Sequence, residues 1–259
     1  MSHPKSIIDT HTHLCDPTFD ADREEVIERA MSVGIVAIIA VSESLADAHR
    51  NIELAAEHSA LRPAAGIYPT LLDMQKTEEM ITLIRQKRAE FFAIGEVGLD
   101  HWVVKDDEAR DCQREIFNRF IKLSLELDLP LNVHSRSAGR HVVKMLLDHS
   151  AQRVQLHAFD GKASTALPAV EAGYLFSIPP SVIRSRQKQK LVKQLPLSSL
   201  LIETDSPVLG PTPGDRNEPA NVKIVVDTIA EIKSVTRDQV IEEAFQNTCR
   251  LYGDLRLLK

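Results

Sequence analysis

Short apolar runs alternate with longer amphipathic stretches along the whole chain. The short runs are rich in Val, Ile and Leu and have the length of buried strands. The stretches between them are longer and mix polar with apolar residues. The short runs predict eight strands, at residues 6–13, 35–42, 62–68, 91–98, 131–135, 154–159, 175–179 and 200–205.

The stretches between these runs have apolar residues three and four positions apart, which is typical of a helix with one buried face. Val26, Ile27 and Ala30 show this spacing. Thr236, with Gln239 three positions later, marks the start of the last helix as its cap. Helices are expected at 23–33, 45–58, 77–89, 111–127, 140–150, 163–172, 185–194, 221–232 and 237–252.

The alternation of strand and helix implies right-handed βαβ units and a parallel sheet. Eight such units in a chain of 259 residues fit a closed (β/α)8 TIM barrel. A doubly wound open sheet would alternate in the same way, but the chain has no Gly-x-Gly-x-x-Gly motif. Because no linker or low-complexity segment divides the sequence, we expect one α/β domain over residues 1–259.

Composition and charge exclude several classes of protein. The chain is 43% hydrophobic and 26% charged, as globular proteins are, and no apolar stretch is long enough to suggest a membrane partner. The net charge of −6 provides no global positive field, so nucleic-acid chemistry would need a local basic groove and bound cations. Three widely spaced cysteines support neither a zinc ribbon nor a disulfide framework. We expect a cytoplasmic protein, with the nucleus as a second location, and no obligate protein partner is evident.

Residues that commonly bind metals lie at the ends of the predicted strands. His11 and His13 end the first strand, and since residues two apart point to the same face, both imidazoles can bind one ion. In a TIM barrel the C-terminal ends of the strands meet at one rim, so strand-end residues converge there. The candidate metal ligands are His11, His13, Glu96, His134, His157 and Asp205.

This set of ligands predicts two divalent ions. Glu96 can bridge them, because one carboxylate has two oxygens. Mixed nitrogen and oxygen ligands suit Zn²⁺, Mn²⁺ or Mg²⁺, and four imidazoles disfavour Mg²⁺ as the tightest binder. Such paired ions promote displacement at phosphorus or attack of water on a carbonyl. One site would be completed by His11, His13 and Asp205, and the other ion would be held by His134 and His157.

At these residues the chain resembles the TatD family of metal-dependent deoxyribonucleases, which belongs to the amidohydrolase-like barrels. The resemblance runs from Ile8 to about Asn247. Several stretches resemble the third TatD-domain-containing subgroup of eukaryotes. The matching motifs are DTHTH at 9–13, AIGEVGLD at 93–100, HSR at 134–136, HAFDG at 157–161, ETDSP at 203–207 and RNEP at 216–219.

The resemblance implies that the same six residues bind metal and that Asp205 also takes a proton from the attacking water. It implies phosphodiester hydrolysis of DNA, with exonucleolytic digestion, while some relatives are implicated in removing D-amino acids from tRNA. One position departs from the family. Where the family usually has Gly-x-His-Pro, this chain has Gly-Ile-Tyr68-Pro. The phenol of Tyr68 can donate a hydrogen bond or stack on a base, but it cannot be a cation near neutral pH.

Basic side chains near the predicted rim are candidates for contacts with a substrate phosphate. Arg136 follows the fifth strand, where a fixed guanidinium would suit a phosphate and a surface salt bridge is the alternative. Arg184 and Arg186 follow the seventh strand, and TIM barrels often bind phosphate after strands seven and eight. Lys188 and Lys190 are expected on a solvated helix face.

The roles of two further residues stay open at this point. Trp102, on the loop after the fourth strand, is either a hydrophobic plug or a platform for stacking a base. Glu203 lies two positions before Asp205 and one layer deeper, where a structural role and a catalytic role are equally compatible with the pattern.

Three hypotheses about function follow from these residues. The first is a divalent-metal-dependent hydrolase that cleaves DNA. The second is a metal-dependent ester or amide hydrolase, such as a D-aminoacyl-tRNA deacylase, whose substrate would be a charged tRNA. The third is a non-catalytic binding protein built on a former enzyme scaffold, and the complete set of ligand residues argues against it.

Overall fold

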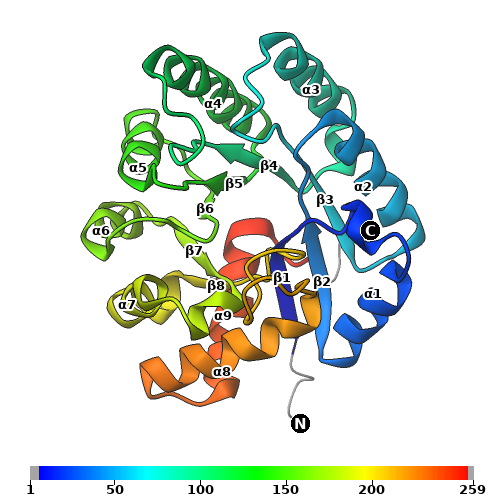
Figure 1. Cartoon of the computed structure of the whole chain (residues 1–259), viewed down its shortest axis with the longest axis vertical. Coiled ribbons are helices and arrows are strands. Elements are labelled where there is room, and N and C mark those ends of the chain that lie inside the picture. Colours follow the sequence, from blue (N-terminus) through cyan, green and yellow to red (C-terminus); the bar gives the residue numbers. More distant parts are fainter. Residues whose placement is uncertain (1–5, 256–259) are drawn as a thin grey trace.

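The computed structural model describes residues 6–255. The strands form one parallel sheet in which each strand pairs with the next along the chain, from β1 to β8. Helices surround this sheet as an outer ring (Figure 1), and the predicted (β/α)8 barrel is confirmed. The strands are β1 (Ile7–Thr12), β2 (Ile35–Ala40), β3 (Leu61–Ala65), β4 (Ala93–Gly98), β5 (Leu131–His134), β6 (Val154–Leu156), β7 (Leu175–Ile178) and β8 (Leu200–Ile202).

Every predicted helix is present, and the last one begins at the predicted cap. Thr236 and Gln239 form a capping box, in which each side chain accepts a hydrogen bond from the other residue's backbone amide. Within residues 6–255, no helix combines the length and the apolar character needed to span a bilayer. The helices are α1 (Arg23–Ser32), α2 (Leu45–Glu57), α3 (Met74–Gln86), α4 (Asp107–Leu127), α5 (Gly139–Asp148), α6 (Ala163–Glu171), α7 (Arg186–Gln194), α8 (Val222–Lys233) and α9 (Arg237–Tyr252).

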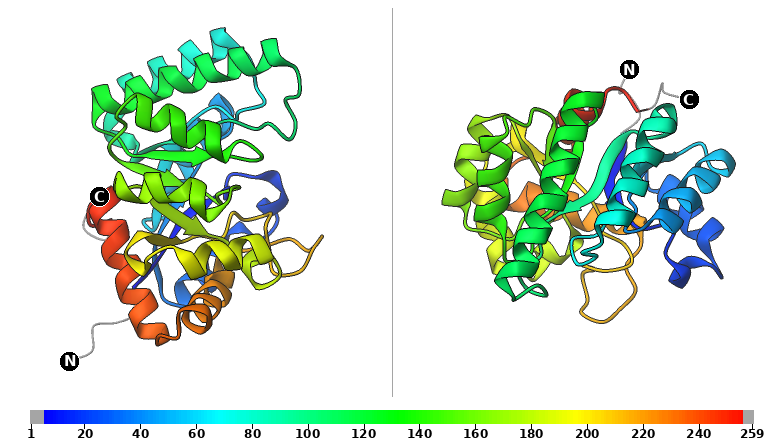
Figure 2. Two further views of the ribbon diagram at one scale, coloured as in Figure 1. Left: turned by 90° about the vertical axis from the view of Figure 1, so that its left-hand side faces the viewer. Right: turned by 90° about the horizontal axis from the view of Figure 1, so that it is seen from above.

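The apolar core has two parts. The larger part lies between the sheet and the outer helices, where Val26 of α1 and Phe117 of α4 are fully buried. The smaller part lies inside the barrel, where Ile8 and other strand residues pack against Tyr252 of α9. Helix α9 crosses behind the barrel in Figure 1. It therefore covers the end opposite the loops that follow the strands, and those loops are left free to form a site (Figure 2).

Hydrogen bonds between β1 and the segment after β8 close the sheet. The backbone amide of Asp205 donates to the carbonyl oxygen of His11 at 2.8 Å. One layer deeper, the two carboxylate oxygens of Asp9 accept hydrogen bonds from the amide and the hydroxyl group of Thr204. Closure of the barrel therefore places candidate ligands from the first and last strands side by side.

Some strand and helix ends differ from the prediction by a few residues. β8 ends at Ile202, so Glu203 and Asp205 lie on the loop just beyond it. The last residue of β8 that pairs with β7 is Ile202, opposite Ile178, so the predicted strand is three residues too long. α3 and α4 begin earlier than predicted, because Asp73 and Asp106 cap their first turns by accepting hydrogen bonds from backbone amides.

Candidate metal centre

The structure brings five of the six candidate ligands into overlapping groups at the C-terminal rim. Within each group the potential ligand atoms all lie within 4.8 Å of one another, and all of these side chains are buried. This spacing fits a shared cation, since two ligand atoms on one ion are about 3–4.5 Å apart at the usual bond lengths. The groups made of buried candidate ligands are His11, His13 and Asp205, and His11, Glu96 and His157; a third group joins His13 and Glu96 to the exposed Glu43.

Glu96 lies between two sets of imidazoles, and each of its carboxylate oxygens faces a different set. Oε2 is 3.6 Å from Nε2 of His11 and 3.4 Å from Nε2 of His13. Oε1 is 2.6 Å from Nδ1 of His134 and 3.5 Å from Nε2 of His157. This arrangement is the one a bridging carboxylate requires, and each oxygen faces one of the predicted pairs, although His11 and His157 also share one of the groups above.

His134 lies at the edge of the centre. Its Nδ1 contacts Glu96, while its Nε2 is 3.3 Å from a carboxylate oxygen of Asp100. The tight groups defined above do not include it. Its predicted role as a ligand for the second ion therefore rests on its contact with Glu96 alone and stays a prediction.

Polar residues inside the barrel fix the orientation of two histidine rings. Nδ1 of His11 donates to the side-chain oxygen of Asn132 at 2.8 Å, because the amide nitrogen of Asn132 already donates to a backbone carbonyl. Nδ1 of His157 donates a hydrogen bond to a carboxylate oxygen of Glu203 at 3.1 Å. Both rings therefore direct Nε2 to the centre, where its lone pair can bind a metal ion once the proton is lost, as in metal-binding histidines.

The contacts of Glu203 assign it a positioning role. Besides His157, its carboxylate accepts hydrogen bonds from the hydroxyl of Ser177 at 2.5 Å and from the amide of Ala158 at 2.9 Å. These bonds occupy both oxygens and direct them away from the tight ligand groups. Of the two roles left open by the sequence, the structure favours the orientation of His157.

In the absence of a cation, protons on the histidines balance the buried carboxylates. Burial by itself lowers the pKa of His11, but the hydrogen bond to Asp205 and the charge of Glu96 outweigh it and raise this pKa to about 10. The pKa of His134 is likewise raised to about 9, chiefly by Glu96 acting against burial. Burial raises the pKa of Asp205, yet the charge of His157 and the hydrogen bonds of His11 and His13 hold it well below its usual range.

These pKa values predict how the stability of the metal-free protein depends on pH. Both histidines have a pKa in the folded protein above the ordinary value of 6.5. Their contribution to stability is therefore complete below pH 6.5, and it is lost as the pH rises toward the folded pKa values of about 9 and 10. The free energy of unfolding of the metal-free protein should fall between pH 7 and pH 9.5, as measured in urea. Protein saturated with Zn²⁺ is the control, since bound cations replace the protons. An equal fall in both forms would contradict the prediction.

Two carboxylates of the site were missed by the sequence analysis. Glu43 follows β2, and one of its oxygens is 3.8 Å from Nδ1 of His13. The strand-end rule that selected the other ligands would have selected it too. Asp100 accepts hydrogen bonds from the amides of Trp102 and Val103 with one oxygen and contacts His134 with the other. It thereby links the loop after β4 to the centre.

The structure places Tyr68 against the centre and Arg136 against the exposed Trp102. The ring of Tyr68 contacts the edge of His134, with 5.2 Å between ring centroids. Burial and the nearby carboxylates raise its pKa, so it is a neutral phenol. Arg136 is exposed, and its guanidinium lies 5.2 Å from the centroid of Trp102. Trp102 is 57% exposed and so is not a buried plug, and Lys105 also lies over its ring; its role as a stacking platform stays a prediction.

The basic residues after β7 are arranged differently from the prediction. Arg184 donates to the carbonyl oxygen of Gly210 at 3.3 Å. Arg186 and Lys190 line a groove between α7 and α8, and the predicted substrate contact of Arg186 gains no support from this position. The prediction of a solvated Lys188 is wrong, because this side chain turns inward and donates to the carbonyl oxygen of Ala158 at 2.8 Å.

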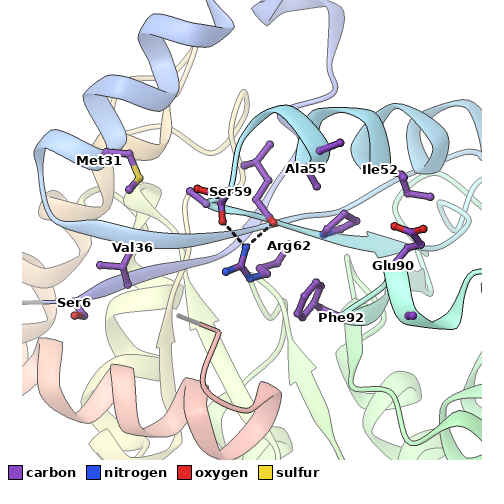
Figure 3. Close-up of a pocket in the computed structure, with 14 residues that line it drawn as sticks. Ser6, Met31, Val36, Ile52, Ala55, Ser59, Arg62, Glu90 and Phe92 are labelled. Atoms are coloured by element: carbon purple, nitrogen blue, oxygen red, sulfur yellow. Dashed lines mark hydrogen bonds between the residues drawn. The ribbon is translucent and has the colours of Figure 1, made fainter. Parts of the chain in front are cut away.

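A separate pocket of about 980 Å³ lies beside the start of β2 and β3, and none of the six candidate ligands lines it (Figure 3). Its wall is mostly apolar, with Phe92 and Ile52 among its residues. Arg62 points into the pocket but makes four hydrogen bonds to backbone carbonyls, including that of Leu255. The guanidinium therefore holds the end of the described chain and is not free for a ligand.

Comparison with known proteins gives a consistent answer. The chain is 41% identical to Deoxyribonuclease TATDN3 of Homo sapiens over 264 residues, which cover 97% of this chain and 96% of that protein. It is 36% identical to the uncharacterized metal-dependent hydrolase YabD of Bacillus subtilis, covering 95% and 98% of the two chains. The crystal structure of the TatD homolog YJJV from Escherichia coli superposes with a TM-score of 0.88 at 28% identity, over 95% of this chain and 97% of that one. The profile of the family described as "TatD related DNase" matches residues 8–253, and the chain belongs to this family.

Proposed function

We propose that this protein is a divalent-metal-dependent phosphodiesterase that cleaves DNA. The observation that carries the proposal is the position of Glu96, whose two oxygens face two separate sets of imidazoles. Such a centre would hold two divalent ions, and paired ions of this kind promote hydrolysis at phosphorus. The human and bacterial relatives named as a deoxyribonuclease and a metal-dependent hydrolase support the same reaction class.

The residues of the chain divide the work of the reaction. His11, His13 and Asp205 would hold one ion, and His134 with His157 the other, with Glu96 between them. Ions bound there would polarise the phosphoryl group and lower the pKa of an attacking water molecule. Asp205 is ionised at neutral pH, since its pKa is low, and its carboxylate accepts the proton that this water loses. Arg136, exposed at the rim, would contact the phosphate backbone.

The proposal extends to digestion from a strand end, with Zn²⁺, Mn²⁺ or Mg²⁺ as the ion. Four histidines favour Zn²⁺ or Mn²⁺ over Mg²⁺ for tight binding. The cytoplasmic location, with the nucleus as a second compartment, stays a prediction from the sequence.

Parallel assays with two substrates test the proposal. Metal-free protein is loaded with Zn²⁺, Mn²⁺ or Mg²⁺ and incubated with an end-labelled DNA strand or with a tRNA charged with a D-amino acid. We expect metal-dependent shortening of the DNA, one nucleotide at a time, which a chelator abolishes. Release of the amino acid without cleavage of DNA would replace the proposal with the ester-hydrolase alternative. Tight metal binding with neither reaction would favour a binding protein.

A further inference from the structure

Lys188 occupies the face of α7 that is directed toward the barrel mouth. At 3.6 residues per turn, Lys188 is rotated by about 200° from Arg186, whereas Lys190 is only about 40° away from Arg186. Arg186 and Lys190 accordingly share the outer groove with Ile232 of α8. The side chain of Lys188 instead reaches Ala158, the residue directly after His157.

The hydrogen bonds around Ala158 tie Lys188 closely to the metal centre. The carbonyl oxygen of Ala158 accepts from Nζ of Lys188 at 2.8 Å, while its amide donates to Glu203 at 2.9 Å. Glu203 in turn orients the ring of His157. The ammonium group is therefore separated from a candidate ligand by one residue of backbone.

Holding the loop after β6 in place does not require a positively charged side chain at position 188. The neighbouring Gln187 already holds the same loop, with its amide nitrogen donating to the carbonyl oxygens of Gly161 at 2.6 Å and Phe159 at 3.3 Å. A neutral donor thus suffices for that contact. Burying an ammonium group is costly, and burial here lowers the pKa of Lys188.

The charged groups around Lys188 are mostly carboxylates. Three carboxylates, those of Glu203, Asp160 and Asp205, favour its charged form, and Arg184 opposes it. Nζ has three protons, and one hydrogen bond is found for it within the described residues. Two of its N–H groups therefore have no hydrogen-bond partner among the described residues.

We propose that Lys188 binds a non-bridging oxygen of the phosphate that is hydrolysed, and thereby stabilises the transition state. This proposal rests on the phosphodiesterase function proposed above. An ammonium group is a compact positive charge that suits phosphate, and TIM barrels commonly bind phosphate after strands seven and eight. Lys188 takes the role that the sequence analysis gave to Arg186.

Three variants in the metal-loaded protein test this role. Lys188→Met removes the charge and keeps the length, Lys188→Arg restores a positive charge, and Lys190→Met is the matched control on the outer face of the same helix. The substrate is the p-nitrophenyl ester of thymidine 5′-monophosphate, an anionic phosphodiester. We expect kcat/KM to fall roughly 100- to 1000-fold in Lys188→Met, to recover in part in Lys188→Arg, and to stay within about twofold in Lys190→Met.

A neutral substrate separates phosphate binding from a structural role. The methylphosphonate analogue of the same ester lacks the negative oxygen, so Lys188→Met should slow its hydrolysis far less. Equal losses on both substrates, or a loss of bound metal or of thermal stability in Lys188→Met, would show that Lys188 has a purely structural role and would overturn the proposal. Activity of Lys188→Met equal to that of Lys190→Met would overturn it as well.

Binding of inorganic phosphate to the metal-loaded protein decides the question without turnover. Isothermal titration should show an affinity reduced roughly 10- to 100-fold in Lys188→Met and unchanged in Lys190→Met. If wild-type protein hydrolyses no phosphodiester, the proposed function fails, yet the titration still reports on Lys188. Unchanged phosphate affinity in Lys188→Met would refute the role of Lys188 even in an active enzyme.

Discussion

Replacing Glu96 with Gln will lower phosphodiesterase activity by more than the ~10- to 100-fold that is typical of losing a residue behind a metal ligand. The amide has nearly the same shape, and at 1% exposure Glu96 lies where no water can take its place. The substitution removes the negative charge between His11 and His134 and leaves one oxygen where two are needed. Metal content after dialysis, measured by mass spectrometry, should fall together with kcat/KM.

Glu43→Gln is the matched control for this substitution. The Glu43 side chain is 48% exposed, and its nearest contact in the centre is His13 at 3.8 Å. Since water screens an exposed carboxylate, we expect a small effect on both metal content and rate. Full activity with a normal metal content in Glu96→Gln would show that Glu96 is not a bridging ligand. A larger loss in Glu43→Gln than in Glu96→Gln would move the bridge to Glu43.

Replacing Asp205 with Asn will reduce kcat by roughly 100- to 10,000-fold, the range expected for the loss of a general base. One oxygen of Asp205 is 3.4 Å from Nε2 of both His11 and His13, so the amide also weakens binding of the ion that these residues would share. Activity should therefore stay low when metal is added in excess, because restored binding does not restore a proton acceptor. The pH dependence of kcat is the second measurement, and its acidic limb should disappear.

Glu203→Gln distinguishes the loss of a base from a general disturbance of the loop. Glu203 lies two residues before Asp205 and is fully buried, but its oxygens are bonded to His157, Ser177 and the amide of Ala158. We expect a 10- to 100-fold decrease in activity, typical for a residue behind a ligand, with partial rescue by excess metal. Equal defects in Asp205→Asn and Glu203→Gln, both rescued by metal, would argue against a base at Asp205.

The sequence predicted which side chains lie together at the rim where each residue could be placed on its own strand. The period of two put His11 and His13 on one face, and the rim of a parallel barrel collected Glu96 and Asp205 from distant segments. The same rule, applied to Ser42 and Glu43 after the second strand, would have added Glu43. Asp100 was visible only as part of a motif, because its contact with His134 depends on how the loop after β4 folds back.

The sequence alone did not predict which side chains of a helix face the barrel. A run of basic residues after β7 shows that a charged helix begins there, but the face that it buries depends on the neighbouring helices. α7 packs between the loop after β6 on one side and α8 on the other, and this packing turns Lys188 inward and Arg186 outward. The helical period alone separates these two residues, yet it does not say which of them faces the barrel mouth.

The amino-acid sequence by itself determined the order of strands and helices, the closed parallel barrel, and the strand-end residues that meet at its rim. These features follow from local periodicity and from the fixed handedness of βαβ units, which leave few alternatives. Only the tertiary structure decided that the two oxygens of Glu96 face different histidines, that Glu203 supports His157, and that Lys188 turns inward to Ala158, next to His157. Contacts of this kind depend on side-chain directions across the barrel, and these are set by packing between segments that are remote in sequence.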